Sequence, residues 1–285
     1  MAFVRWIAIV FFCGFLSLPA HLQAEERPSR IVSLHLCADQ YLMYLADPDQ
    51  IMSLGPRADD PRISFLATSE NWPRIVGPRT ENILQLEPDL VITAPFGNLQ
   101  LRSFLRGEGL RVVDMGAPQS LAEVFAEVRM IAALIGQEAR GAALIDDIQA
   151  ARQAALDAGA GRSLLYLQRR GFANGRGTLF AEMIADLAFD NVLSDVEGIQ
   201  RIPLELLVGL HPEAVLVALD DVEPGGTVTA QDQGMALLAH PSLKAGFPDA
   251  RWFALPPRET VCPGPATIAL YQRLGAIAAE LNKGS

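Results

Sequence analysis

Apolar positions in the first part of the chain fall into short continuous runs, and most runs are followed by a stretch in which apolar residues recur at helical spacing. The runs predict buried β-strands, and the stretches predict helices that cover a sheet. Alternation of this kind indicates an α/β lobe with a mostly parallel sheet. The predicted strands are Arg30–Leu34, Ile51–Leu54, Leu90–Thr93 and Gly109–Val113, and the predicted helices are Ala38–Ala46 and Leu99–Arg106.

The pattern changes between residues 120 and 158, where the period is helical throughout. This segment predicts two helices, and the second, Gln137–Ala158, is long enough to run between two lobes as a stiff connector. Strand and helix signals then alternate again, which predicts a second α/β lobe. Its expected elements are strands Ser163–Gln168 and Arg251–Leu255, and helices Thr178–Leu187, with Thr178 as N-cap, and Thr267–Leu281.

Two segments repeat each other at a constant offset of 124 residues, which aligns Glu81 with Glu205 and Pro88 with Pro212. Residues 81–92 and 205–216 share a glutamate, a helical apolar pattern, a proline with an acidic residue after it, and a closing apolar run. Each copy predicts a short helix, a proline stop and a buried strand. The recurrence suggests two similar half-molecules.

The length of 285 residues favours about two domains. Arg5 precedes the apolar stretch Trp6–Leu18, which is too short to span a bilayer, and a polar segment ending in Ala24 follows it. This predicts a secretory signal peptide rather than a retained anchor or a lipid attachment at Cys13. The expected organisation is a signal peptide over 1–24, an N-terminal α/β lobe over 25–118, a helical connector over 119–159 and a C-terminal α/β lobe over 160–285.

The formal net charge is −10, and removal of Arg5 with the signal makes it −11. Such an acidic surface does not favour nucleic acid or anionic lipid. Signal removal leaves two cysteines, Cys37 and Cys262, in an oxidising compartment. We expect them to form a disulfide that joins the start of the first lobe to the end of the second, with two separate buried thiols as the alternative.

Several of these features together resemble periplasmic substrate-binding proteins of ABC importers for ferric siderophores, haem and cobalamin. They are Arg30–Leu34 with its helix, the repeated Glu-to-Ile element, the long central helix, and the segment from Gly175 to Asn191. The resemblance implies an α/β fold of two Rossmann-like lobes, joined by a long rigid helix, with a ligand cleft between them. It also implies a periplasmic, monomeric carrier with no catalysis and no cofactor, which delivers its ligand to an ABC permease dimer in the inner membrane.

In this family one surface glutamate of each lobe docks onto permease arginines, and Glu81 and Glu205 are the matching positions. A glutamate at a helix start is also favourable to the helix dipole, which is the simpler explanation for either residue alone. Their recurrence in both lobes favours the docking role.

The resemblance places ligand contacts in loops at the carboxyl ends of strands. Aromatic and arginine side chains in those loops suit a bulky, partly planar, anionic ligand, and a ferric siderophore fits best, with haem or cobalamin as alternatives. The aromatic residues Trp72 and Phe96 could instead pack inside the lobe. Arg57 and Arg62 could instead form ion pairs with Asp59 and Asp60, which lie between them in the sequence. The candidate ligand-binding residues are His35, Leu36, Arg57, Arg62, Trp72, Phe96, Arg169, Arg170, Phe172 and Arg258.

Two other classes compete with a carrier. An exported thiol enzyme would use Cys37 and His35, but residues two apart on a loop rarely converge as a catalytic pair, and a disulfide would block the thiol. A cell-surface interaction protein without a small ligand is the third possibility. Binding of a free metal ion is disfavoured because His35, His211 and His240 do not lie in equivalent loops.

Overall fold

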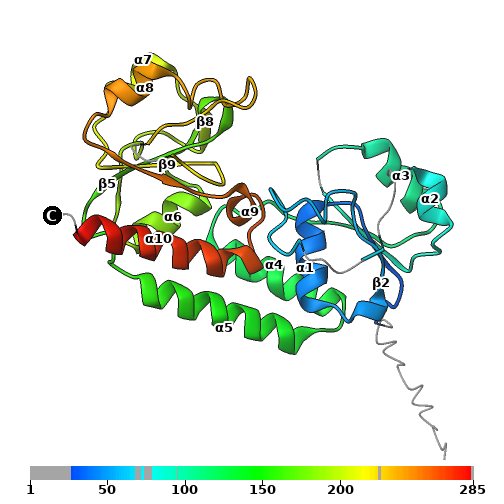
Figure 1. Ribbon diagram of the computed structural model, residues 1–285. Helices are drawn as coiled ribbons and strands as arrows, with labels where there is room; N and C mark the ends of the chain where they lie inside the picture. Colours follow the sequence, from blue (N-terminus) through cyan, green and yellow to red (C-terminus); the bar gives the residue numbers. More distant parts are fainter. Residues whose placement is uncertain (1–26, 68–71, 74–78, 95, 224–225, 284–285) are drawn as a thin grey trace, which may run out of the picture.

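The computed structural model describes residues 27–67, 72–73, 79–94, 96–223 and 226–283, which form two α/β lobes resting on a layer of long helices (Figure 1). The predicted fold class is confirmed, with one sheet all parallel and the other mixed. The predicted signal peptide and Cys13 lie outside the described residues. Within the described ranges, no helix is both long and apolar enough to cross a membrane.

The first lobe has a parallel sheet in the order β2-β1-β3-β4. Every residue of β3 is buried, which explains why this strand is an unbroken apolar run in the sequence. Pairing of Ile31 with Leu90 and of Val91 with Val112 sets the register. The elements are β1 (Ile31–Ser33), α1 (Leu36–Leu45), η1 (Pro48–Gln50), β2 (Ile51–Ser53), α2 (Thr80–Leu84), β3 (Leu90–Thr93), α3 (Leu99–Gly107) and β4 (Val112–Asp114).

The second lobe has the sheet order β10-β9-β5-β6-β8, with β7 also paired to β5. Strands β5, β9 and β10 are parallel, while β6 runs antiparallel to both β5 and β8. The elements are β5 (Ser163–Leu167), η2 (Arg169–Gly171), β6 (Phe172–Asn174), α6 (Leu179–Asp186), β7 (Asp190–Asn191), β8 (Ile199–Arg201), α7 (Leu204–Leu207), β9 (Ala214–Val217), α8 (Pro241–Gly246), β10 (Arg251–Ala254) and α9 (Pro257–Thr260).

The sequence repeat corresponds to a repeat of structure. In both lobes a short helix, α2 or α7, leads into the strand that pairs with the first strand of the lobe. The acidic residue after each proline accepts a hydrogen bond at the start of that first strand, from the Ser29 N–H to Asp89 at 2.7 Å and from the Ser163 N–H to Glu213 at 2.9 Å. Asp89 and Glu213 therefore do the same thing in the two lobes, since each holds the start of the first strand next to the segment that follows the proline.

Three long helices lie beneath both lobes, namely α4 (Leu121–Leu134), α5 (Glu138–Ala155) and α10 (Pro265–Lys283) (Figure 1). A single cluster of buried apolar side chains includes Leu42 of the first lobe, Leu216 of the second, and Ile148 and Leu274 of the helices between them. Burial of apolar surface is the main stabilising term in folding. A core shared in this way resists any motion that would pull the lobes apart.

Asp39, in the first turn of α1, carries a fully buried carboxylate in this region. Its Oδ1 accepts the Gly55 N–H at 2.9 Å, and a Cβ on Gly55 would lie 2.9 Å from Oδ2, so the approach requires glycine. Burial raises the pKa of Asp39 to about 6, against the opposing hydrogen bonds from the Gly55 N–H and the Ser33 hydroxyl. Folded Asp39 therefore holds its proton more tightly than unfolded Asp39 does.

A pH dependence of stability follows from this raised pKa. Since the unfolded pKa is 3.8, the contribution of Asp39 is most favourable below about pH 4 and is lost as the pH rises through about 6. The loss is about 3 kcal/mol. We expect Asp39→Asn to be increasingly stable relative to the wild type between pH 4 and 7, in urea unfolding curves measured at each pH. The exposed Asp146→Asn is the matched control, and a difference between D39N and wild type that does not change with pH would contradict the argument.

Candidate functional site

A cavity of about 450 Å³ lies between the lobes, at the carboxyl ends of parallel strands from both sheets. The loops after β1, β3 and β4 contribute His35, Ala94 and Gly116, and the loop after β5 contributes Gln168. Crevices at the carboxyl ends of strands are where open α/β sheets bind ligands, and the volume is within the range of about 300 to 1,000 Å³ typical of ligand sites. We call this space the inner cavity.

Apolar side chains form most of the wall of the inner cavity. Tyr166 and Phe180 pack with their ring centroids 4.3 Å apart, and burial raises the pKa of Tyr166 to about 12. At the rim, Phe96, Ile199 and Val261 are 77%, 50% and 47% exposed. Large apolar side chains left in solvent around a concave site are typical of a binding surface.

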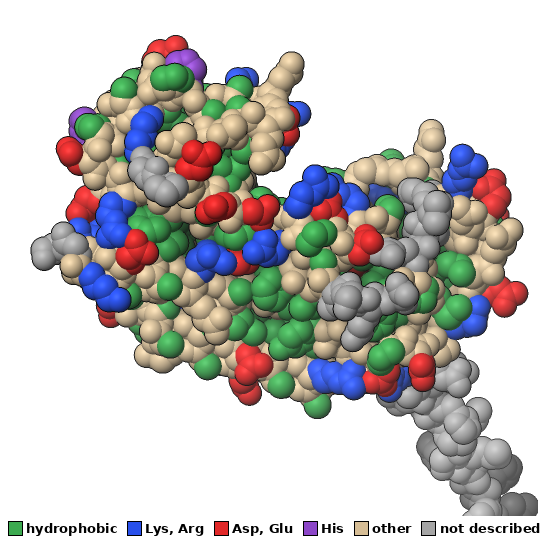
Figure 2. All heavy atoms as spheres, in the orientation of Figure 1, with side chains coloured by type: hydrophobic (Ala, Val, Ile, Leu, Met, Phe, Trp, Pro, Cys, Tyr) green, Lys and Arg blue, Asp and Glu red, His purple; other side chains and the backbone are tan. Residues whose placement is uncertain are grey.

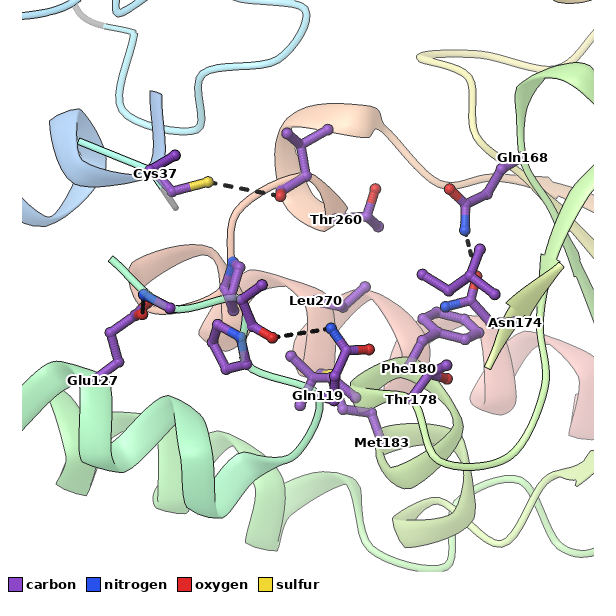
Figure 3. A pocket seen from close by; sticks show the side chains of 18 of the residues that line it. Cys37, Gln119, Glu127, Gln168, Asn174, Thr178, Phe180, Met183, Thr260 and Leu270 are labelled. Atoms are coloured by element: carbon purple, nitrogen blue, oxygen red, sulfur yellow. Dashed lines mark hydrogen bonds between the residues drawn. The ribbon is translucent and has the colours of Figure 1, made fainter. Parts of the chain in front are cut away.

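Polar groups converge on the same space (Figure 3). Gln168 donates a hydrogen bond to Asn174, and the Gln119 side chain donates to the Ala117 carbonyl at 3.1 Å. Glu127, on α4, accepts the Gly116 N–H at 2.8 Å. Burial raises the pKa of Glu127, although the Gly116 N–H and the Tyr41 hydroxyl oppose this effect.

His35 precedes α1 and lines the inner cavity from the first lobe. Its Nδ1 is buried without a hydrogen-bond partner among the described residues. Burial lowers the pKa of His35, so the imidazole is neutral at pH 7. A neutral imidazole with an unpaired nitrogen can bind a hydrogen-bonding group or a metal centre carried by a ligand.

A second hollow, of about 640 Å³, also touches both lobes, and we call it the charged groove. Arg57 and Arg62 line it from the first lobe, while Arg169, Asp220 and Asp232 line it from the second. Figure 2 shows basic and acidic side chains gathered at the mouth of the cleft between the lobes.

The arginines of the charged groove already have acidic partners. Arg62 lies 2.8 Å from Asp60, whose pKa it lowers to about 2, and Arg57 lies 3.7 Å from the same carboxylate. Arg169 lies 2.7 Å from Asp232. These pairs balance charge locally, so an anion entering the groove would have to compete with them.

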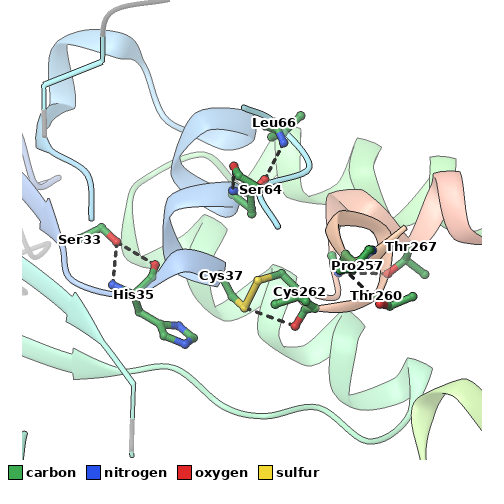
Figure 4. The surroundings of a disulfide bond; sticks show 12 residues. Ser33, His35, Cys37, Ser64, Leu66, Pro257, Thr260, Cys262 and Thr267 are labelled. Atoms are coloured by element: carbon green, nitrogen blue, oxygen red, sulfur yellow. Dashed lines mark hydrogen bonds between the residues drawn. A yellow bond between two sulfur atoms is a disulfide. The ribbon is translucent and has the colours of Figure 1, made fainter. Parts of the chain in front are cut away.

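The segment from Pro257 to Pro263 separates the two hollows, since Val261 lines both of them. Cys262 in this segment forms the predicted disulfide with Cys37 at the start of α1, with the two Cα atoms 5.1 Å apart (Figure 4). Arg273 of α10 holds Glu259 of α9 through two hydrogen bonds, at 2.5 and 2.6 Å. The segment is thus fixed to α1 of the first lobe and to α10, and we call it the strap.

The structure distributes the ten sequence-predicted ligand residues among several places. His35 and Phe96 line the inner cavity, whereas Arg57, Arg62 and Arg169 line the charged groove. The remaining residues line neither hollow: Leu36 begins α1, Trp72 packs against the core, Arg170 and Phe172 are exposed around the start of β6, and Arg258 lies 2.7 Å from Asp220.

The sequence-based prediction missed most of the polar lining, including Gln119, Glu127 and Asn174. One signal was present, because Glu127 lies among Val124, Val128 and Ile131 on the buried face of a helix, and an acid in an apolar stripe is unusual. Gln119 and Asn174 gave no signal, because tertiary structure alone brings them to the cavity: Gln119 lies in the loop before α4, and Asn174 lies in β6.

Comparison with known proteins agrees with this geometry. A family model described as periplasmic binding protein matches residues 73–235, more than half of the chain. No curated protein sequence matches.

Solved structures match along nearly the whole chain. They include the periplasmic haem-binding protein HutB of Vibrio cholerae (TM-score 0.68, 18% identity, 87% of this chain and 98% of that one) and the vitamin B12-binding protein BtuF of the same organism (0.62, 17%, 90% and 99%). An ABC-type Fe³⁺-hydroxamate transport protein of Saccharomonospora viridis also matches (0.60, 19%, 87% and 92%). At these sequence identities, the likeness to solved structures establishes only the fold of this chain. The family model establishes that the chain is a member of the family. The chain belongs to the periplasmic binding protein family and is a binding protein rather than an enzyme.

Proposed function

We propose that the protein captures a ferric siderophore or a similar bulky metal chelate in the periplasm and delivers it to the permease of an ABC importer. The observation that supports this most is the inner cavity, a preformed apolar space with convergent polar groups between two lobes that share one core. The solved neighbours include proteins named for binding iron chelates, haem and vitamin B12.

Haem is the second candidate, because of His35. This side chain lines the inner cavity with a buried, unpaired Nδ1, and a neutral imidazole is a common axial ligand of haem iron. Cobalamin is a third ligand of the same class.

Titration of the mature protein distinguishes these ligands. Native mass spectrometry and thermal melts would be recorded with catecholate and hydroxamate ferric siderophores, haem and cobalamin. We expect a one-to-one complex with one class, and stabilisation of about 2.7 kcal/mol when the free ligand is at about 100 times its Kd. Absence of binding by every compound would contradict the proposed function.

A pair of variants locates the bound ligand. Ile199→Arg places a long charged side chain at the rim of the inner cavity and should weaken binding at least tenfold. Phe104→Arg changes a side chain of similar exposure on α3, which lines neither hollow, and should bind as the wild type does. Equal binding by both variants would show that the ligand occupies another place.

Delivery to a permease requires a surface that the permease recognises. Glu81 on α2 and Glu205 on α7 are both exposed, and neither side chain has a hydrogen-bond or ion-pair partner among the described residues. Figure 1 shows α2 and α7 on the outer parts of the two lobes, away from α5. We assign these glutamates to docking, one from each lobe.

A further inference from the structure

The lining of the inner cavity carries almost no formal charge. Among the described residues that line it, none is lysine or arginine, and Glu127 is the only carboxylate. His35 is neutral because burial lowers its pKa. A ligand that enters this space therefore meets no cationic side chain.

The cations expected for an anionic ligand lie on the other side of the strap. Arg57, Arg62 and Arg169 line the charged groove, and each has a carboxylate within 2.7 to 3.7 Å. Burying an anion without a cationic partner is strongly unfavourable. An anionic chelate in the inner cavity would find no such partner among the described residues that line it.

Glu127 makes the cavity less favourable still for an anion. Its side chain lies on α4, only 7% of the residue is exposed, and the Gly116 backbone holds one of its oxygens. A Cβ on Gly116 would lie 2.8 Å from that oxygen, so the glycine permits this contact. The net charge of −10 also repels anions at long range.

Neutral polar groups are what the cavity does offer. Gln119, Gln168, Asn174 and Thr260 supply amide and hydroxyl groups next to the apolar wall (Figure 3). Such groups can hydrogen-bond amide and hydroxamate oxygens, which carry partial charge, without neutralising a full charge. The lining therefore suits an uncharged, amide-rich chelate.

We propose that the inner cavity selects neutral or cationic ferric hydroxamate chelates and rejects anionic ones, and that Glu127 favours a positive group on the ligand. This inference rests on the proposed function and names the chemical class of its ligand. It replaces the expectation from sequence that arginines pair with an anionic ligand.

Three ferric trihydroxamates with the same iron centre test the inference. Ferrioxamine B carries a net charge of +1, its N-acetyl derivative is neutral, and its N-succinyl derivative carries −1. We expect ferrioxamine B to bind at least as tightly as the acetyl form, and the succinyl form to bind at least tenfold more weakly than the acetyl form, by fluorescence titration or calorimetry.

Glu127→Gln keeps an oxygen to accept the Gly116 N–H, so its melting temperature should stay close to that of the wild type. It should reduce the preference for ferrioxamine B over the acetyl form and improve binding of the succinyl form. Glu138→Gln, at an exposed position in the first turn of α5 that lines neither hollow, should leave all three affinities unchanged. Equal discrimination in E127Q and the wild type would overturn the role of Glu127.

Haem and a ferric tris-catecholate, which are both anionic, complete the series. Tightest binding by either of them, or by the succinyl form, would overturn the charge preference while the proposed function stood. Binding of none of these compounds or of cobalamin would instead overturn the proposed function, and the inference with it.

Discussion

Reversing the charge at both glutamates proposed for docking, as Glu81→Lys with Glu205→Lys, is expected to abolish uptake without changing ligand affinity. Both side chains are exposed and neither lines the inner cavity, so ligand contacts are preserved. At the permease, two attractive contacts would become repulsive, and like charges brought together cost several kcal/mol at an interface. Each single reversal should reduce uptake less than the double variant does.

The measurement is accumulation of the chelate that binds in the titration, in cells or vesicles containing the cognate permease. Glu138→Lys with Asp146→Lys is the matched control, because it changes the net charge by the same amount on exposed positions of α5. Normal uptake by the Glu81 and Glu205 double variant, with the protein present at wild-type level, would remove the docking assignment.

Removing the disulfide, as Cys37→Ser with Cys262→Ser, is expected to have the largest effect on stability. The bridge joins residues 225 positions apart, and closing a loop of that length constrains the unfolded chain by about 5 kcal/mol in the chain-entropy model. We expect the free energy of unfolding to fall by up to this amount, measured in guanidinium chloride with and without a reducing agent. The reducing agent should affect the wild type and leave the double variant unchanged.

The same variant should also release ligand faster. The bridge fixes the strap to α1, and the strap forms one wall of the inner cavity through Thr260 and Val261. Without the bridge, the strap is free to move and must become ordered each time a ligand binds. The entropy lost in this ordering lowers the affinity for the ligand. Stopped-flow release of the bound chelate gives the off-rate, and identical rates in oxidised and reduced protein would show that the strap plays no part in retention.

The sequence predicted the central parallel strands of both lobes well, because β1, β3, β5 and β9 are almost wholly buried and appear as apolar runs. Leu90–Thr93 has the predicted bounds, and Thr178 caps α6 as predicted, accepting the Ala181 N–H at 3.2 Å. Strand β6, by contrast, is absent from the predicted elements. It is only three residues long, which is too short for a periodic signal.

The site was predictable in location but not in chemistry. Loops at the carboxyl ends of strands do form it, yet the strap divides the space so that Arg57 and Arg169 face one hollow while His35 and Phe96 face another. Tertiary packing decides which of the two hollows a loop lines. The sequence of the loop itself does not contain this information. The predicted bridge between Cys37 and Cys262 is confirmed, but the division of the cleft by the strap depends on tertiary packing that the cysteine positions do not reveal.

The position of α10 has a consequence for cooperativity. Leu270, Tyr271 and Leu274 of this helix belong to the apolar core that both lobes share, and they follow both sheets in the sequence. The lobes therefore bury this part of their apolar surface only when α10 is in place. Each lobe depends on the same helix, so the two lobes form one cooperative unit rather than two independent domains.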